Sequence, residues 1–208
     1  MRRLLALLAL CTVASALESK PVVLITAYGP FAGRGVNGSE TIARALDGLE
    51  IAGAVVRVRV LAVRWGEPEA RVPAAIDELT PVLVVGLGEG HPDRVAVESS
   101  ARNQAQHPDE AGRAPPATLQ VLGPTQRAAT LVFDPAWCTE AAVPVVASDD
   151  AGAYLCNNLL YVALASAVPR VGFIHLPPQG ETPADDYRAA LAPIVRTIIE
   201  RNLATAPE

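Results

Sequence analysis

Residues 81–87 read PVLVVGL and contain no charged or polar side chain. A strand that is apolar along its whole length is buried on both faces, which is typical of a parallel sheet with helices on either side. The glycine-rich turn Gly88-Glu89-Gly90 follows and separates the run from the next apolar segment. This stretch therefore predicts an α/β fold in which residues 81–87 form a buried strand.

Apolar runs and helical patterns alternate along the rest of the chain. The alternation predicts a largely parallel sheet whose strands are joined by crossover helices. Ser39 can cap one helix, and Thr182 can cap the last one with Pro183 at its first position. Further strands are expected at residues 21–27, 54–63, 95–100, 143–147 and 170–175, and helices at residues 39–49, 67–79, 154–167 and from 183 onward.

The length and the charge of the chain limit its class. Its 208 residues are enough for one domain with a sizeable core, and the sequence shows no domain boundary. The formal net charge of −5 argues against nucleic acid or an anionic membrane surface as a partner. We therefore expect a single domain with neither nucleic acid nor a membrane surface as its partner.

The first 16 residues differ in character from the rest. A positive start, Met1-Arg2-Arg3, precedes an apolar run over residues 4–13 and the small residues Ala14-Ser15-Ala16. This order is typical of a secretory signal peptide, and the run is too short to span a bilayer comfortably. We expect residues 1–16 to be removed and residues 17–208 to form an exported domain, periplasmic or secreted, with no membrane association. If the segment is instead a buried first helix, the protein is cytoplasmic.

One cysteine lies where a predicted strand passes into a predicted helix. Residues 148–157 read SDDAGAYLCN, so a turn follows the strand and Cys156 falls in the first helical turn. The helix dipole lowers the pKa of a thiol at that place, and free backbone N–H groups there can hold an oxyanion. Cys156 is therefore a candidate nucleophile; the alternative is a small buried hydrophobe, as most free cysteines are.

Two other residues could serve such a nucleophile. His175 ends a predicted buried strand just before Pro177, where it could act as a general base. Glu98 lies in the apolar run after residue 94, and a buried carboxylate beside an imidazole would orient it. The structural alternatives are a hydrogen-bonded core histidine and an ion pair of Glu98 with Arg94 or Arg102.

Two weaker patterns suggest other chemistry. The glycines at positions 86, 88 and 90 could approach a phosphate, but no helix follows them immediately, which makes a dinucleotide site a poor interpretation. The repeated His-Pro-Asp at residues 91–93 and 107–109 could ligate a metal, although such residues more often form turns. We therefore expect neither a metal nor an organic cofactor.

Four segments together resemble the pyroglutamyl peptidase I (pyrrolidone-carboxylate peptidase) family. They appear in the order that the family shows, and the similarity covers about residues 21–200 in outline. The cysteine and histidine segments are the most specific of the four. The segments are residues 26–33 (TAYGPFAG) with Asn37 and Ser39, residues 86–98 with Ala101 and Asn103, residues 148–161, and residues 172–177 (GFIHLP).

The resemblance implies a fold, an activity and a set of site residues. The fold is a three-layer α/β/α sandwich of the phosphorylase/hydrolase type, and the activity is removal of an N-terminal pyroglutamyl residue from a peptide with a blocked N-terminus, without a metal or cofactor. Members of the family are often oligomers, so a homo-oligomer is compatible with the resemblance. Cys156 would attack the acyl carbon, His175 would move the proton and Glu98 would orient His175. The substrate pocket would be formed by Tyr28, Phe31, Leu87, Tyr154 and Leu155.

Departures from the family pattern leave two alternatives open. Leu87 stands where the family usually has a glutamine that helps to recognise the lactam, so only its backbone could take over, and the loop over residues 88–110 is reshaped. A thiol hydrolase for another small acyl amide would fit these changes. An exported binding protein without activity would fit a bridge between Cys138 and Cys156 in an oxidising compartment.

Overall fold

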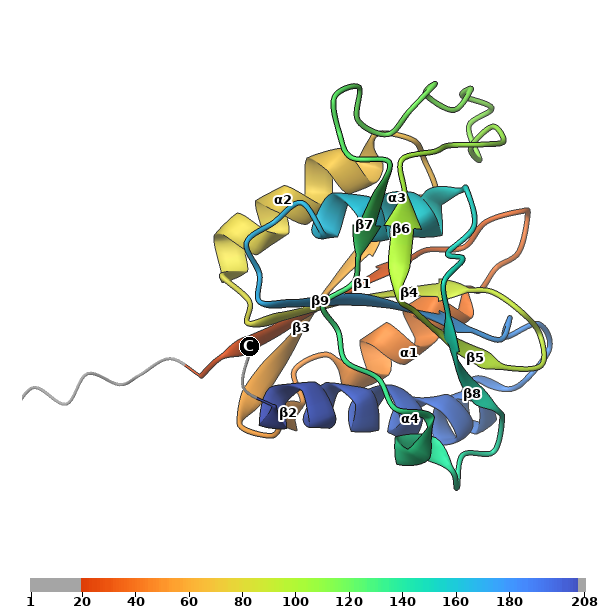
Figure 1. Cartoon of the computed structure of the whole chain (residues 1–208). Coiled ribbons are helices and arrows are strands. Elements are labelled where there is room, and N and C mark those ends of the chain that lie inside the picture. The colour runs from red at the N-terminus through yellow and green to blue at the C-terminus, as the bar shows by residue number, and fades with distance from the viewer. Residues whose placement is uncertain (1–19, 206–208) are drawn as a thin grey trace, which may run out of the picture.

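The computed structural model describes residues 20–205, which form one twisted sheet with helices on both faces (Figure 1). The sheet has the strand order β2-β3-β1-β4-β9-β5-β8, and a separate ribbon consists of β6 and β7. The α/β sandwich expected from the sequence is confirmed. The strands are β1 (Val22–Tyr28), β2 (Glu50–Ile51), β3 (Ala54–Leu61), β4 (Leu83–Glu89), β5 (Val95–Glu98), β6 (Ser100–Arg102), β7 (Gln126–Ala128), β8 (Val145–Ser148) and β9 (Arg170–Leu176).

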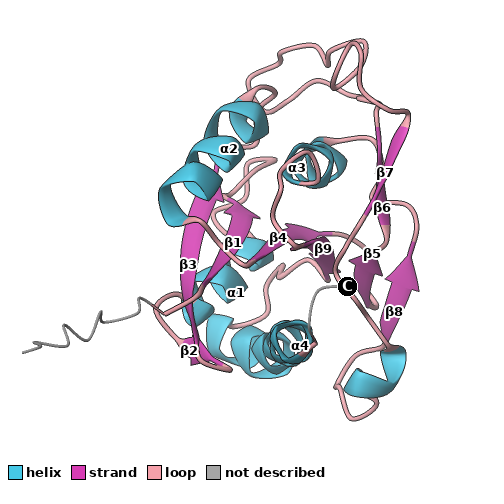
Figure 2. Cartoon of the chain, turned by 60° about the vertical axis from the view of Figure 1, so that its left-hand side comes forward, coloured by secondary structure: helices cyan, strands magenta, loops and turns pink. Residues whose placement is uncertain are grey.

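The helices divide into two pairs, one on each face of the sheet (Figure 2). Helices α1 (Gly38–Leu46) and α4 (Ala184–Ala204) cover one face, and α2 (Glu67–Leu79) and α3 (Leu155–Ala163) cover the other. A short 3-10 helix, η1 (Pro135–Cys138), lies against α4 and β8. It occupies the segment just before β8, which is too short for a longer α-helix. The result is three layers with the sheet in the middle.

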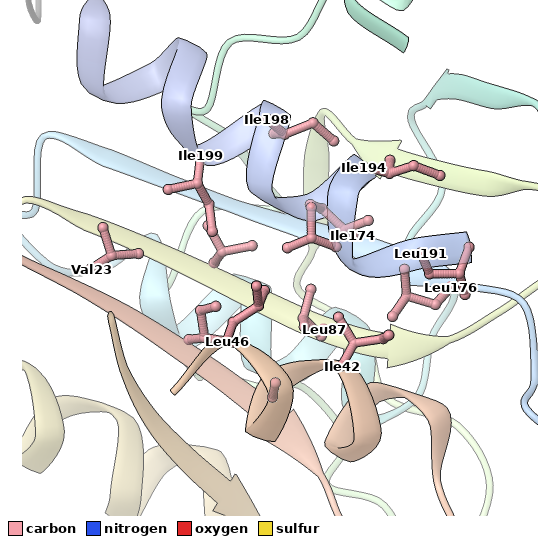
Figure 3. Close-up of a cluster of buried hydrophobic side chains, with 14 of the residues drawn as sticks. Val23, Ile42, Leu46, Leu87, Ile174, Leu176, Leu191, Ile194, Ile198 and Ile199 are labelled. Atoms are coloured by element: carbon pink, nitrogen blue, oxygen red, sulfur yellow. The ribbon is translucent and has the colours of Figure 1, made fainter. Parts of the chain in front are cut away.

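Two hydrophobic cores lie on the two faces, and β4 contributes to both. Leu83, Val85 and Leu87 point toward α1 and α4, whereas Val84 points toward α2 and α3. Alternation along a strand between two covered faces explains why residues 81–87 are apolar without interruption. Figure 3 shows the α1 and α4 side, where Leu87 packs with residues of both helices and of β9: Ile42, Leu46, Ile174, Leu176, Leu191, Ile194 and Ile198.

Strand direction places the candidate residues. β3, β1, β4 and β9 run parallel to one another, and β5 runs parallel to β8 but antiparallel to β9. In that antiparallel pair Glu98 is opposite Phe173, so its side chain lies on the same face as Phe173 and diagonal to His175. A largely parallel sheet was predicted correctly, but the reversal that brings Glu98 to this face was not.

Two of the predicted helix caps are wrong by one or two residues. The cap of α1 is Asn37, whose side chain accepts hydrogen bonds from the backbone N–H and hydroxyl of Ser39, so Ser39 lies inside the helix. The cap of α4 is Pro183 rather than Thr182, because Pro183 keeps an extended backbone and its carbonyl accepts the first helical bond from Tyr187. Helix α3 ends at Ala163, earlier than the predicted residue 167, where turns and the Ser166 hydroxyl take over the free carbonyls.

The two cysteines of the described chain do not form a bridge. Cys138 and Cys156 are both free, Cys138 packs against the core under α4, and Cys156 packs against the core under α3. The sheet lies between them, and a disulfide needs α-carbons less than about 7 Å apart.

The predicted signal peptide, residues 1–16, lies outside the described residues. Within residues 20–205 no helix combines the length and the apolar character needed to cross a membrane.

Candidate active site

The thiol of Cys156 is held at the start of α3. Tyr154 is the N-cap residue, so Cys156 is in the first turn, where backbone N–H groups lack helical partners. The side chain of Asn157 accepts a hydrogen bond from the backbone N–H of Arg102 and donates to the carbonyls of Arg102 and Gln104, at 2.8 to 3.1 Å. These bonds fix the first turn of α3 against β6 and therefore fix the thiol.

His175 and Glu98 are in direct contact. Nδ1 of His175 lies 2.8 Å from Oε1 of Glu98, and the Glu98 side chain is 1% exposed. Neither of the alternative ion pairs forms, because Arg94 pairs with Asp93 and Arg102 pairs with Asp150. A buried carboxylate at Nδ1 fixes the ring orientation and leaves Nε2 available for the thiol side.

The pKa of His175 reflects this setting. Burial by itself lowers the pKa, but the charge of the Cys156 thiolate, the hydrogen bond to Cys156 and the contact with Glu98 outweigh burial and raise the pKa to about 10. The imidazole therefore holds its proton at neutral pH next to Cys156. A thiolate paired with an imidazolium is the reactive form of a cysteine nucleophile.

Glycines on β4 and directly after it make room for this arrangement. A β-carbon on Gly88 would lie 2.6 Å from Sγ of Cys156, and one on Gly90 would lie 2.7 Å from Cβ of His175. A β-carbon on Gly86 would meet the ring of Phe173 at 2.4 Å. The glycines that suggested a phosphate site in the sequence therefore serve a different purpose, which is close packing of β4 against the cysteine and histidine segments.

A cavity of about 240 Å³ opens in front of the thiol. Its walls include five residues expected from the sequence in addition to Cys156: Tyr28, Phe31, Tyr154, Leu155 and His175. Leu87 does not line the cavity, because its side chain is fully buried in the core under α1 and α4. The cavity suits a small, flat and largely apolar group with a few polar atoms.

The cavity walls are braced from behind. The Tyr28 hydroxyl donates a hydrogen bond of 2.7 Å to the carbonyl of Leu155 and so ties the end of β1 to the start of α3. The ring of Tyr154 packs edge-on against Trp65 with 5.5 Å between centroids, and Trp65 donates its indole N–H to the His107 carbonyl. The site therefore depends on contacts among β1, α3 and the loop after β6.

Comparison with known proteins matches this geometry to a family. The model of the family described as "Pyroglutamyl peptidase" matches residues 21–203. The chain belongs to the pyroglutamyl peptidase family. A pyrrolidone-carboxylate peptidase of Chromobacterium violaceum is 40% identical over 162 residues, which cover 74% of this chain and 77% of that protein. A pyrrolidone-carboxylate peptidase of Pyrococcus furiosus is 34% identical over 167 residues, which cover 74% of this chain and 80% of that protein.

A solved structure supports the same assignment. The crystal structure of pyrrolidone carboxyl peptidase from Pyrococcus furiosus superimposes with a TM-score of 0.79 at 27% identity. The superposition covers 88% of this chain and 98% of that one. The chain therefore shares its overall fold with this member of the family.

Several residues at the cavity of this family member were not predicted as site residues. Asn37, Val63, Ala151, Gly152 and Glu89 also line it. Glu89 is the most unexpected of them, because its charge lies next to an apolar pocket. The sequence did contain a signal for it, since Glu89 is a lone charge between two glycines at the end of a fully apolar strand.

A second cavity of about 440 Å³ lies on the Glu98 side of His175. It shares His175, Ala151 and Gly152 with the first cavity, and its other walls include Arg94 and Asp149.

The His-Pro-Asp segments do not form a metal centre in the described chain. His91 pairs with Asp93, and no group of three His, Cys, Asp or Glu residues in positions 20–205 is placed to hold an ion.

Proposed function

We propose that the protein removes N-terminal pyroglutamyl residues from peptides, with Cys156 as nucleophile, His175 as proton carrier and Glu98 as the residue that orients His175. The observation that carries the proposal is the contact of His175 with Glu98 on one side and with Cys156 on the other, at the mouth of a small aromatic cavity. Membership of the pyroglutamyl peptidase family supports the substrate class.

The first half of the reaction follows from the protonation state of His175. The Cys156 thiolate attacks the pyroglutamyl carbonyl carbon and forms a C–S bond, while the carbonyl oxygen takes up the negative charge. The free N–H groups at the start of α3, that of Cys156 among them, are placed to stabilise this oxyanion. The His175 imidazolium then gives its proton to the leaving amine, the C–N bond breaks and a thioester remains.

The second half depends on the loss of charge at Cys156. In the thioester the sulfur is neutral, so the charge that raises the pKa of His175 most is absent. The pKa of the imidazole therefore falls, and the neutral ring can accept a proton from water. The resulting hydroxide attacks the thioester carbonyl, pyroglutamate is released and the Cys156 thiolate is restored next to the His175 imidazolium.

In this proposal the two cavities bind different parts of the substrate. The pyroglutamyl ring occupies the 240 Å³ cavity between Phe31 and Tyr154, and Tyr28 and Leu155 form part of its wall. Leu87 has only a backbone role, because its side chain lies in the core. The leaving peptide extends past His175 toward the 440 Å³ cavity, since the two cavities share that residue and the leaving amine must reach its ring.

The direct test is release of a fluorophore from pyroglutamyl-aminomethylcoumarin under reducing conditions. Wild type and Cys138→Ala should release it at similar rates, because Cys138 lies on the opposite face of the sheet. Cys156→Ala should be inactive. Absence of turnover by the wild type, together with His175-dependent alkylation of Cys156, would instead favour a hydrolase for another small acyl group, for which Leu87 and Glu89 are the motivating residues.

We also propose that residues 1–16 are a signal peptide and that residues 17–208 form the exported domain. The support is the order of charge, apolar run and small residues in the sequence. Expression of the full chain in a bacterium, followed by mass measurement of the periplasmic protein, should give a product that begins at residue 17. A full-length product confined to the cytoplasm would contradict the proposal. Light scattering of that product gives the oligomeric state.

A further inference from the structure

The loop between β1 and α1 carries one wall of the cavity. Its Phe31 packs against the core under α2 and α3, and the Ala32 N–H donates a hydrogen bond of 2.9 Å to Oε2 of Glu110. Phe31 lines the cavity, whereas Ala32, Gly33 and Gly35 are exposed. Ala32 and Gly33 have φ values of 55° and 70°, a region that an alanine adopts only when other contacts hold it. Something outside the loop must therefore keep Phe31 in place.

Arg34 connects Phe31 to the sheet. Its guanidinium carbon lies 4.2 Å from the centroid of the Phe31 ring, and its Nη2 lies 2.6 Å from Oε2 of Glu89. A planar guanidinium can stack on an aromatic face and pair with a carboxylate at the same time, which an ammonium group cannot do. The Arg34 side chain thus links the wall residue Phe31 to the end of β4.

Glu89 is anchored on its other oxygen. Oε1 accepts hydrogen bonds from the backbone N–H of Gly38 at 2.7 Å and from that of Gln179 at 3.1 Å. The side chain is 3% exposed, and Oε2 accepts no aligned hydrogen bond, so the guanidinium of Arg34 balances its charge. A buried carboxylate that loses its partner is strongly unfavourable. Glu89 therefore fixes Arg34 while joining β4 to the start of α1 and to the loop after β9.

We propose that Arg34 and Glu89 are positioning residues that hold the Phe31 ring against the acyl cavity and thereby set the affinity for the pyroglutamyl group. This inference rests on the proposed function. Neither residue takes part in the chemical step, because Cys156, His175 and Glu98 are held by contacts that do not involve them. Loss of the pair loosens the wall, raises KM and leaves kcat and the reactivity of Cys156 nearly unchanged.

The kinetic test compares Arg34→Ala, Arg34→Lys, Glu89→Gln and the double variant Arg34→Ala/Glu89→Gln with wild type on pyroglutamyl-aminomethylcoumarin. Arg34→Ala should raise KM by about tenfold, and Arg34→Lys should give an intermediate value because it keeps the charge but loses the stacking. The double variant should match Arg34→Ala. The control is Arg44→Ala, which removes a surface pair with Glu40 on α1 and should leave KM unchanged.

Two further measurements separate this proposal from the proposed function. Alkylation of Cys156 by iodoacetamide should proceed at the wild-type rate in every variant, and amide hydrogen exchange of a peptide spanning residues 29–38 should be faster in Arg34→Ala than in wild type and Arg44→Ala. Unchanged hydrogen exchange and unchanged KM in Arg34→Ala would overturn the proposal. Recovery of the wild-type KM in the double variant would also overturn it, because the rise in KM of Arg34→Ala would then come only from the unpaired buried charge of Glu89. If wild type does not turn over the substrate at all, the proposed function fails and the exchange result decides this proposal alone.

Discussion

Glu98 and His175 meet across two antiparallel strands, with 2.8 Å between Oε1 and Nδ1, although 77 positions separate them in the chain. The contact is diagonal: Glu98 is opposite Phe173 in the ladder, and His175 lies two residues further along the same face. Both side chains are therefore directed toward α3, where Cys156 lies in the first turn. The strand pairing, and not a loop, sets the geometry of the candidate triad.

Replacement of Glu98 by glutamine tests the orienting role. The amide can still contact the ring but carries no charge, so it holds the imidazolium less well and allows the wrong tautomer. We expect kcat to fall by about 10²- to 10⁴-fold with a much smaller change in KM. Steady-state kinetics on pyroglutamyl-aminomethylcoumarin measures both. A variant with near-wild-type kcat would show that Glu98 is merely structural.

The titration of His175 should depend on Cys156. In Cys156→Ala the thiolate charge and its hydrogen bond are gone, and burial again favours the neutral ring. The pKa of His175 should therefore fall from about 10 toward the ordinary value for histidine, while the contact with Glu98 still raises it. NMR titration of the ring protons can follow it, because the chain contains only three histidines. An identical titration in wild type and variant would contradict the proposed ion pair.

The same pKa predicts how stability changes with pH. The folded-state pKa of His175, about 10, lies above the value of 6.5 for an exposed histidine. The stabilisation that this group contributes is then fully present below pH 6.5 and is lost as the pH rises toward 10. The gap in unfolding free energy between wild type and His175→Gln should narrow over this range by roughly 2–5 kcal/mol. Urea titrations at several pH values measure the gap, and a constant gap would oppose the assignment.

Gly88→Ala tests the close approach of β4 to the thiol. The added methyl group would lie 2.6 Å from Sγ of Cys156, so the sulfur or the strand must move. We expect a loss of kcat of more than about tenfold and a destabilisation of roughly 1–3 kcal/mol from overpacking. Gly35→Ala is a matched control, because no atom lies within 4 Å of the added carbon there. Equal effects of the two substitutions would show that crowding at Cys156 is not the cause.

The core under α4 should determine stability without affecting chemistry. Ile194 is 4% exposed and packs in the cluster that holds Leu87, on the face of the sheet opposite Cys156. Ile194→Ala should lower the free energy of unfolding by about 2–5 kcal/mol, through lost burial and the cavity left behind. Activity per folded molecule should stay near that of wild type. Denaturant titration and active-site labelling of the folded protein measure the two quantities.

Much of the fold could be predicted from the sequence alone. Residues 81–87 are apolar on both faces, and such a run has few stable solutions other than a strand covered on both sides. Most strands and helices lie within a few residues of their predicted positions. Cys156, His175 and Glu98 could be proposed because each belongs to a local segment whose place, a strand end or a helix start, depends on short-range patterns. Local preferences and solvent exclusion act on neighbouring residues, so the sequence displays them directly.

What the tertiary structure decided concerns pairs of residues far apart in the chain. The reversed direction of β5, the contact of Glu98 with His175, the separation of Cys138 from Cys156 by the sheet and the ion pair of Arg34 with buried Glu89 all depend on which strand lies beside which. Leu87 is the simplest example. Its place in a family motif predicted that it lines the substrate pocket, but side chains alternate along β4, so the Leu87 side chain lies in the core on the opposite face of the sheet. Long-range pairing is set by the packing of the whole sheet, and no local stretch contains it.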